Sequence, residues 1–85
     1  MSEVGGGHLR KRSFSLAGHR TSVALEPAFW AALERLAGAR GVPLARLVAE
    51  ADAARAEAPS PAPLASALRV LALREAGAAP EKSGR

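Results

Sequence analysis

The first residues with recognisable chemistry are the basic side chains Arg10-Lys11-Arg12, followed by Arg20. Glu3 is the only acidic residue among residues 1–25, whereas residues 26–58 contain basic and acidic side chains in near balance. Clustered cations of this kind bind a polyanion such as DNA by releasing counterions, with an affinity that falls steeply with salt. The other interpretation is a solvated flank that keeps a small protein soluble, and the net charge of +4 agrees with both.

Residues for catalysis or metal binding are few. The chain has no cysteine, and His8 and His19 are too few and too far apart for a structural zinc site. Glu50 and Asp52 have no partner that would tune them, and neither a Gly-rich phosphate loop nor a nucleophile in suitable company is present. We therefore expect no enzyme, no metal and no cofactor.

Hydropathy points to a protein outside the membrane. The sequence contains no run of about 20 apolar residues, and its start lacks the apolar core of a signal peptide. We expect a cytoplasmic protein, associated with the nucleoid if it binds DNA.

The first element that must position these cations is a strand over residues 20–25. Its alternation with period two separates two faces, with Thr21, Val23 and Leu25 on one and Arg20, Ser22 and Ala24 on the other. Pro27 then suits a first helical turn, where its missing N–H is harmless. A helix is predicted from Pro27 to about Ala39.

Two amphipathic helices follow the strand. Gly41 suits the left-handed residue after the first, and Pro43 suits the opening of the second. The apolar stripes are Phe29, Leu33, Leu36 and Ala37, then Leu44, Leu47, Val48 and Ala51. Trp30, adjacent to Phe29, is expected at the edge of the core or in a subunit contact.

A hairpin ahead of this strand is also indicated. Residues 13–17 alternate, and Gly18-His19 resembles a two-residue hairpin loop with glycine first. With that loop, Phe14 faces Val23, Leu16 faces Thr21, and their side chains share the face of Leu25. The alternative is that residues 12–17 form a loose arm that orders only on a phosphate backbone or a partner protein.

Size argues for self-association. A strand and two helices comprise ~36 residues, and domains below about 40 rarely bury enough surface without disulfides, metals or oligomerisation. The edge of the 20–25 strand offers free backbone groups to a second copy. We predict a homodimer, as a two-stranded ribbon or, with a hairpin from each copy, a four-stranded sheet.

The remaining segments are a linker, a helix and two tails. Residues 59–63 contain three alternating prolines and form a Pro-rich linker. An accessory helix is predicted over residues 64–75, either covering the shared core or docking on another protein. Residues 1–9 and 76–85 are expected to be disordered, as an N-terminal arm and a tail.

The chain resembles the ribbon-helix-helix superfamily of the Met and Arc repressors. The residues that carry the likeness are Arg20 to Leu25, Pro27, Phe29, Leu33, Leu36, Gly41, Leu44, Leu47 and Val48. The run 11–22, followed by 25–30 and 64–70, further resembles a bacterial subfamily of short ribbon-helix-helix proteins. The resemblance implies a mostly helical α+β fold, with a ribbon-helix-helix domain over residues 10–58 and an intertwined homodimer.

The resemblance also implies a ribbon lying in the major groove of double-stranded DNA, with phosphates held at helix N-termini. Mapped here, the base-facing residues are Arg20, Ser22 and Ala24, and the phosphate anchor begins at Leu44. With the basic cluster, the DNA-binding set is Arg10, Lys11, Arg12, Arg20, Ser22, Ala24 and Leu44. The dimer core is Val23, Leu25, Phe29, Leu33, Leu36, Leu47 and Val48.

Two functions remain at this stage. The favoured one is a homodimeric DNA-binding protein that regulates transcription by reading the major groove with its ribbon. The other is a homo-oligomeric interaction module of the same fold, without sequence-specific DNA binding, that engages a protein partner through the helix at 64–75.

Overall fold

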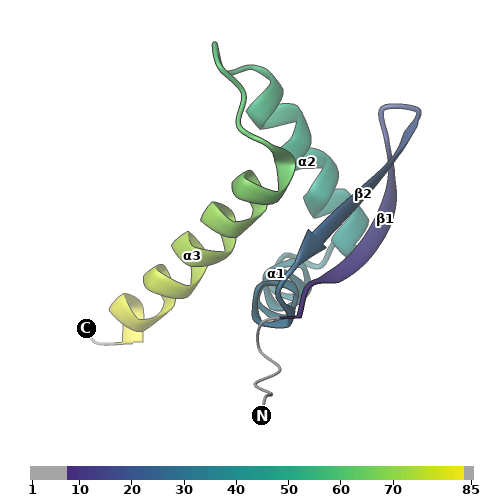
Figure 1. The fold of residues 1–85 in the computed structure, drawn as a ribbon. Helices are drawn as coiled ribbons and strands as arrows, with labels where there is room; N and C mark the ends of the chain where they lie inside the picture. The colour runs from purple at the N-terminus through teal and green to yellow at the C-terminus, as the bar shows by residue number, and fades with distance from the viewer. Residues whose placement is uncertain (1–7, 84–85) are drawn as a thin grey trace.

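The protein folds as a β-hairpin followed by three helices (Figure 1). We describe residues 8–83 of a computed structural model of the chain. Its elements are β1 (Arg10–Leu16), β2 (His19–Leu25), α1 (Pro27–Arg40), α2 (Leu44–Ala56) and α3 (Leu64–Ser83). Residues 1–7, 84 and 85, on which parts of the predicted arm and tail fall, lie outside the described residues.

The predicted hairpin is confirmed, and the interpretation of residues 12–17 as a loose arm is wrong. β1 and β2 pair antiparallel, and β1 includes the basic cluster at residues 10–12. The predicted register is wrong by two residues, because Phe14 pairs with Thr21 and Leu16 with His19. The side chains keep their predicted faces, since a shift of two preserves the alternation.

The turn explains the register. Ala17 and Gly18 form the loop, and both have positive φ, 52° and 83°. Two consecutive residues of this kind are typical of the turn whose twist matches a hairpin, whereas the predicted Gly18-His19 loop needs only the glycine to be left-handed. Ala17 is the one non-glycine residue with positive φ among the described residues.

The two-helix unit matches the prediction closely. α1 begins at Pro27 and ends at Arg40, one residue beyond Ala39. Gly41 is left-handed, with φ 71°, and its N–H bonds to the Gly38 carbonyl. Pro43 precedes α2 as its N-cap instead of serving as its first residue, and its carbonyl accepts from Leu47 N–H.

The core lies between one face of the hairpin and the helices. It contains Phe14 and Leu16 from β1, Val23 and Leu25 from β2, and residues from all three helices. In α1 the buried aromatic residue is Trp30, whereas Phe29 is half-buried. Phe29 was predicted in the core and Trp30 at its edge or in a subunit contact, but the structure has the reverse. The reason is Phe14 of β1, which adds an apolar surface beside Trp30, and the two ring centroids lie 6.0 Å apart.

α3 completes the core of its own chain. Leu64, Leu68 and Ala72 are buried, and the helix lies against α1, α2 and β2. α3 thus covers the core of its own chain, and the sharing of that core with a second copy stays a prediction. The helix also runs beyond residues 64–75 to Ser83, so most of the predicted tail continues α3. The linker at 59–63 is non-helical, as predicted.

Candidate nucleic-acid interface

The face of the hairpin turned away from the helices is small, polar and basic. Alternation places three cross-strand pairs on it: Lys11 with Ala24, Ser13 with Ser22, and Ser15 with Arg20. The Oγ atoms of Ser13 and Ser22 lie 3.0 Å apart at its centre. We call these six residues the outer face. Its short hydroxyl side chains leave the middle low, with one cation towards each end.

The cations of the outer face have no acidic neighbour among the described side chains. The sequence from His8 to Leu25 contains no acidic residue. Within the described side chains, no carboxylate lies in ion-pair distance of Lys11 or Arg20. A surface with unpaired cations and several hydroxyl groups is suited to phosphate oxygens and to base edges.

The hairpin divides the predicted basic cluster between its two sides. Lys11 shares the outer face with Arg20, Ser22 and Ala24, as an alternating strand requires. Arg10 and Arg12 belong to the other side, where the Arg10 carbonyl accepts a 2.8 Å hydrogen bond from Trp30 Nε1. The predicted set of strand residues is therefore brought together, but the cluster 10–12 does not act as one patch.

Arg12 is held against α1. Its Nη1 donates to Glu34 Oε2 at 2.7 Å, and its guanidinium carbon lies 4.9 Å from the centroid of the Trp30 ring. The ring face attracts the cation, so the aromatic contact adds to the ion pair. Arg12 thus differs from Lys11, its neighbour in the strand, because its charge is already engaged.

The predicted phosphate anchor lies at the start of α2. Leu44 is the first residue of the helix, and its side chain is half-buried against the core. Pro43 provides no side-chain cap, and the first turn contains no acidic residue. The N–H groups of Leu44 and Ala45 precede the first helical hydrogen bond, which Arg46 makes to the Pro43 carbonyl. They are available to an anion.

The residues predicted to form a dimer core are enclosed within one chain. Val23, Leu25, Leu33, Leu36, Leu47 and Val48 are buried, and Phe29 is half-buried beneath the Arg69 guanidinium. α3 supplies the covering layer that a second copy was expected to supply. Burial of these residues therefore does not depend on a partner.

In and beside the helices, four carboxylates are paired with arginines: those of Glu26, Glu34, Glu50 and Asp52. Arg40 and Arg46 both reach Glu50, at 3.3 and 3.4 Å, and Arg55 reaches Asp52 at 2.9 Å. Arg69 of α3 donates to Glu26 at 3.0 Å, which ties α3 to the start of α1. The pKa of Glu26 lies below its ordinary value because its carboxylate accepts a hydrogen bond from its own backbone and another from Arg69.

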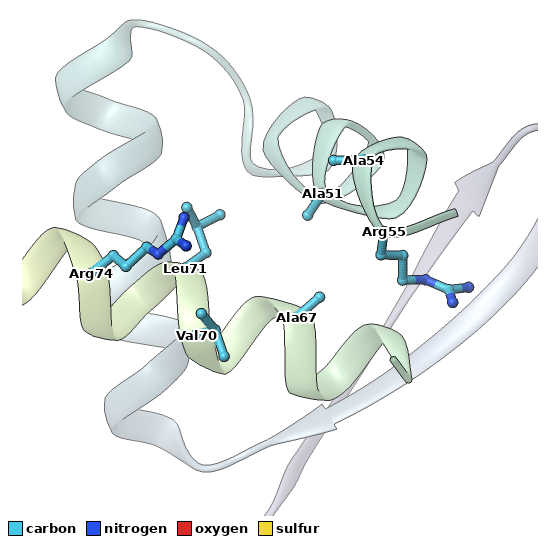
Figure 2. A pocket seen from close by; sticks show the side chains of 7 residues that line it. All are labelled: Ala51, Ala54, Arg55, Ala67, Val70, Leu71 and Arg74. Atoms are coloured by element: carbon cyan, nitrogen blue, oxygen red, sulfur yellow. The ribbon is translucent and has the colours of Figure 1, made fainter. Parts of the chain in front are cut away.

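A groove separates α2 from α3. Figure 2 shows Ala51, Ala54 and Ala67 along it, with Val70, Leu71 and two arginines, Arg55 and Arg74. Val70 and Leu73 of α3 are among the most exposed large apolar residues, with exposed fractions of 51% and 63%. The groove is apolar and open, and no carboxylate lines it.

Some residues of the site were missed from the sequence. Ser13 and Ser15 were assigned only to the alternation of the first strand, yet they are two of the three serines on the outer face. The period-two alternation that places Phe14 and Leu16 on the buried face also places Ser13 and Ser15 on the outer face, so this pattern could have identified them. The Trp30 hydrogen bond to Arg10 had no sequence signal, because it joins residues from different elements.

Two further findings concern the described residues alone. Histidine and acidic side chains do not gather in threes anywhere in this part of the chain, the grouping that would suit a metal ion. Its helices are all too short or too polar to span a bilayer.

Comparison with known proteins identifies the family. A family model described as the ribbon-helix-helix domain matches residues 9–76, which include the hairpin, α1, α2 and the described part of α3 that covers the core. The chain belongs to the ribbon-helix-helix family, whose members are typically non-enzymatic regulators that dimerise and bind DNA. The searches of curated proteins and of solved structures return no match.

Proposed function

We propose that the protein is a homodimeric DNA-binding regulator of transcription that reads the major groove with the outer face of its hairpin. The observation that carries the proposal is the outer face itself, where Lys11 and Arg20 flank Ser13 and Ser22 without a neutralising carboxylate among the described side chains. A stable fold does not require unpaired cations on this face, whereas the binding of a polyanion does require them.

The dimensions of the hairpin support this use. The major groove is about 12 Å wide and admits a two-stranded ribbon, and neighbouring strands lie about 4.8 Å apart. β1 and β2 form such a ribbon within one chain. Pairing two β2 edges would give a four-stranded sheet, which is wider than the groove. We therefore infer that each copy of a dimer inserts its own hairpin.

Each residue of the outer face has a role in this proposal. Arg20 contacts guanine with its two-pronged guanidinium, Ser22 accepts from or donates to a base edge, and Ala24 contacts a thymine methyl. Lys11 neutralises a phosphate, and the N–H groups at Leu44 hold another at the start of α2. Sequence specificity then rests mainly on Arg20.

We propose a homodimer because members of this family generally dimerise. A twofold symmetric dimer would also match DNA sites made of two paired half-sites. An intertwined dimer that shares the predicted core would require α3 to be exchanged between copies, because α3 already covers that core. Sedimentation equilibrium measures the mass directly, and a monomer at DNA-binding concentrations would contradict the proposed dimer.

We place the protein in the bacterial cytoplasm, at the nucleoid.

The experiment is fluorescence anisotropy of a labelled mixed-sequence duplex titrated with protein at several salt concentrations. We expect binding at low salt that weakens steeply as salt rises, since phosphate contacts release counterions. The double variant Lys11→Ala/Arg20→Ala should lose most of this binding while keeping its thermal transition. Absence of binding by the parent at low salt would contradict the proposal.

A second candidate function is favoured by the groove between α2 and α3. Its apolar lining and the exposure of Val70 fit an interaction module that holds a protein partner. Truncation after Ala58 is not a clean test, because Leu64, Leu68 and Ala72 would leave the core. Val70→Glu keeps the core intact. It should leave DNA binding unchanged if the outer face is the functional surface and abolish partner binding if the groove is.

A further inference from the structure

Arg12, the last cation of the basic cluster 10–12, lies in surroundings that differ from those of Lys11 and Arg20. Arg12 lies at the junction of β1 and α1, paired with Glu34 at 2.7 Å and stacked on the Trp30 ring. Both partners of the ion pair remain accessible, with side-chain exposures of 42% for Arg12 and 52% for Glu34. Exposed ion pairs contribute little to stability, so this pair can be exchanged for a stronger one.

A cavity of about 320 Å³ opens at this junction. Arg10, Lys11 and Arg12 line it from β1, and Pro27, Trp30 and Glu34 line it from α1. The Lys11 side chain points to the outer face, so two guanidinium groups, those of Arg10 and Arg12, share this side of the hairpin with the one carboxylate of Glu34, which leaves the cavity net positive. The hydrogen bond from Trp30 Nε1 to the Arg10 carbonyl fixes its two walls relative to each other.

We propose that this cavity is a phosphate site on the edge of the DNA-reading hairpin, and that Glu34 sets its affinity by competing with the phosphate for Arg12. The inference rests on the proposed function. When a two-stranded ribbon lies in the major groove, the edge of β1 faces one sugar-phosphate wall. A phosphodiester there meets Arg12, whose planar fork fits its two free oxygens, with Arg10 beside it.

The competition follows from charge. The Glu34 carboxylate occupies Arg12 in the free protein and repels an incoming phosphate, so binding requires Arg12 to exchange one anion for the other. Trp30 holds the guanidinium over its ring in both states. Glu34 is therefore a positioning residue that lowers DNA affinity without touching the bases.

The test is Glu34→Gln, which keeps the size of the side chain and removes its charge. Duplex affinity at low salt should rise roughly three- to tenfold, the effect of removing one like charge a few ångström away. The matched control is Asp52→Asn, which removes a carboxylate paired with Arg55 on α2, outside the cavity. In an Arg12→Ala background, Glu34→Gln should have no effect beyond that control.

Trp30 gives a second readout, because it is the only tryptophan of the chain. Its fluorescence should change as duplex is added to the parent and should not change in Arg12→Ala. If the parent binds duplex but Glu34→Gln and Asp52→Asn behave alike, the cavity inference is wrong and the proposed function stands.

If the parent binds no duplex, the proposed function fails and inorganic phosphate becomes the probe. A saturable change of Trp30 fluorescence that requires Arg12 would then support a phosphate site with another source of phosphate. No response to inorganic phosphate would overturn the site.

Discussion

The outer face of the hairpin carries cations and no carboxylate, whereas the helical layer carries both signs and pairs four carboxylates with arginines. In the helices, Glu34, Glu50 and Asp52 each accept from an arginine, as does Glu26 just before α1. On the outer face, Lys11 and Arg20 have no such partner within the described side chains. Paired charges hold elements together locally, whereas unpaired cations on an exposed face are available to a ligand. The contrast separates the part of the molecule that maintains the fold from the part that we propose to bind DNA.

Apolar burial differs between the two regions as well. The apolar side chains of the hairpin that face the helices, such as Val23 and Leu25, are buried, while those of the outer face are exposed or half-buried. Substitutions of buried side chains should therefore change stability and leave surface binding intact, and substitutions on the outer face should do the reverse.

The largest expected effect is on stability, in the helical layer. Leu68→Ala should lower the free energy of unfolding by about 2–5 kcal/mol, because Leu68 is fully buried in α3 and the substitution leaves a cavity. Urea denaturation followed by circular dichroism measures it. Leu73→Ala, at an exposed position of the same helix, should change stability by less than about 0.5 kcal/mol. Similar effects at both positions would mean that α3 does not belong to the core.

The next effect is on binding, at the outer face. Arg20→Ala should weaken binding to a selected operator by about 1–3 kcal/mol, with little effect on stability, because a base-edge contact is lost. Competition anisotropy against mixed-sequence duplex measures the loss of preference. Arg74→Ala is the control, since it removes the same charge from α3. An equal loss of affinity in both variants would assign the effect to net charge.

A smaller effect separates phosphate contact from base reading. Lys11→Ala should weaken binding to every duplex alike and reduce the slope of log affinity against log salt by about 1, since one phosphate contact is lost. The measurement is a salt series on two unrelated duplexes. A change that depends on sequence would contradict the role of Lys11 as a phosphate contact.

The smallest effect concerns pH and the attachment of α3. The pKa of Glu26 is lowered by the hydrogen bond from its own backbone and by Arg69, so the ionised form is favoured in the folded protein. The ionised Glu26 carboxylate therefore stabilises the folded protein at pH values above the ordinary carboxylate pKa. This stabilisation is lost as the pH falls through the lowered pKa of Glu26 in the folded protein.

Thermal melting of the parent and of Glu26→Gln over a pH series measures this contribution. The two proteins should differ at neutral pH and converge at acidic pH. A difference that stays constant with pH would rule out the ionised pair as its source.

Much of the fold could be predicted from local patterns. Pro27, Gly41 and the apolar spacing between them placed α1 and the turn to within a residue, because backbone constraints of proline and glycine act locally. The faces of the hairpin followed from alternation. Its register did not, because the turn places Ala17 in a left-handed conformation that a non-glycine residue seldom adopts.

The missed features depend on contacts between distant elements. The burial of Trp30 in preference to Phe29 is caused by Phe14, and the separation of Arg12 from Lys11 is caused by Glu34. The self-contained core results from α3, which lies beyond the linker and was not included in the size argument. Of the candidate site, the outer-face residues of β2 followed from the sequence, whereas the environment of each cation required the structure.

The most direct test of the central claim is a nuclear magnetic resonance titration of the protein with duplex DNA, followed through backbone amide shifts. We predict that the largest changes occur at residues 11–15 and 20–24, with a second set at the start of α2 and little change along α2 and α3 at their shared groove. Changes confined to the helices around Val70, with an unperturbed hairpin, would contradict the proposed DNA-binding face.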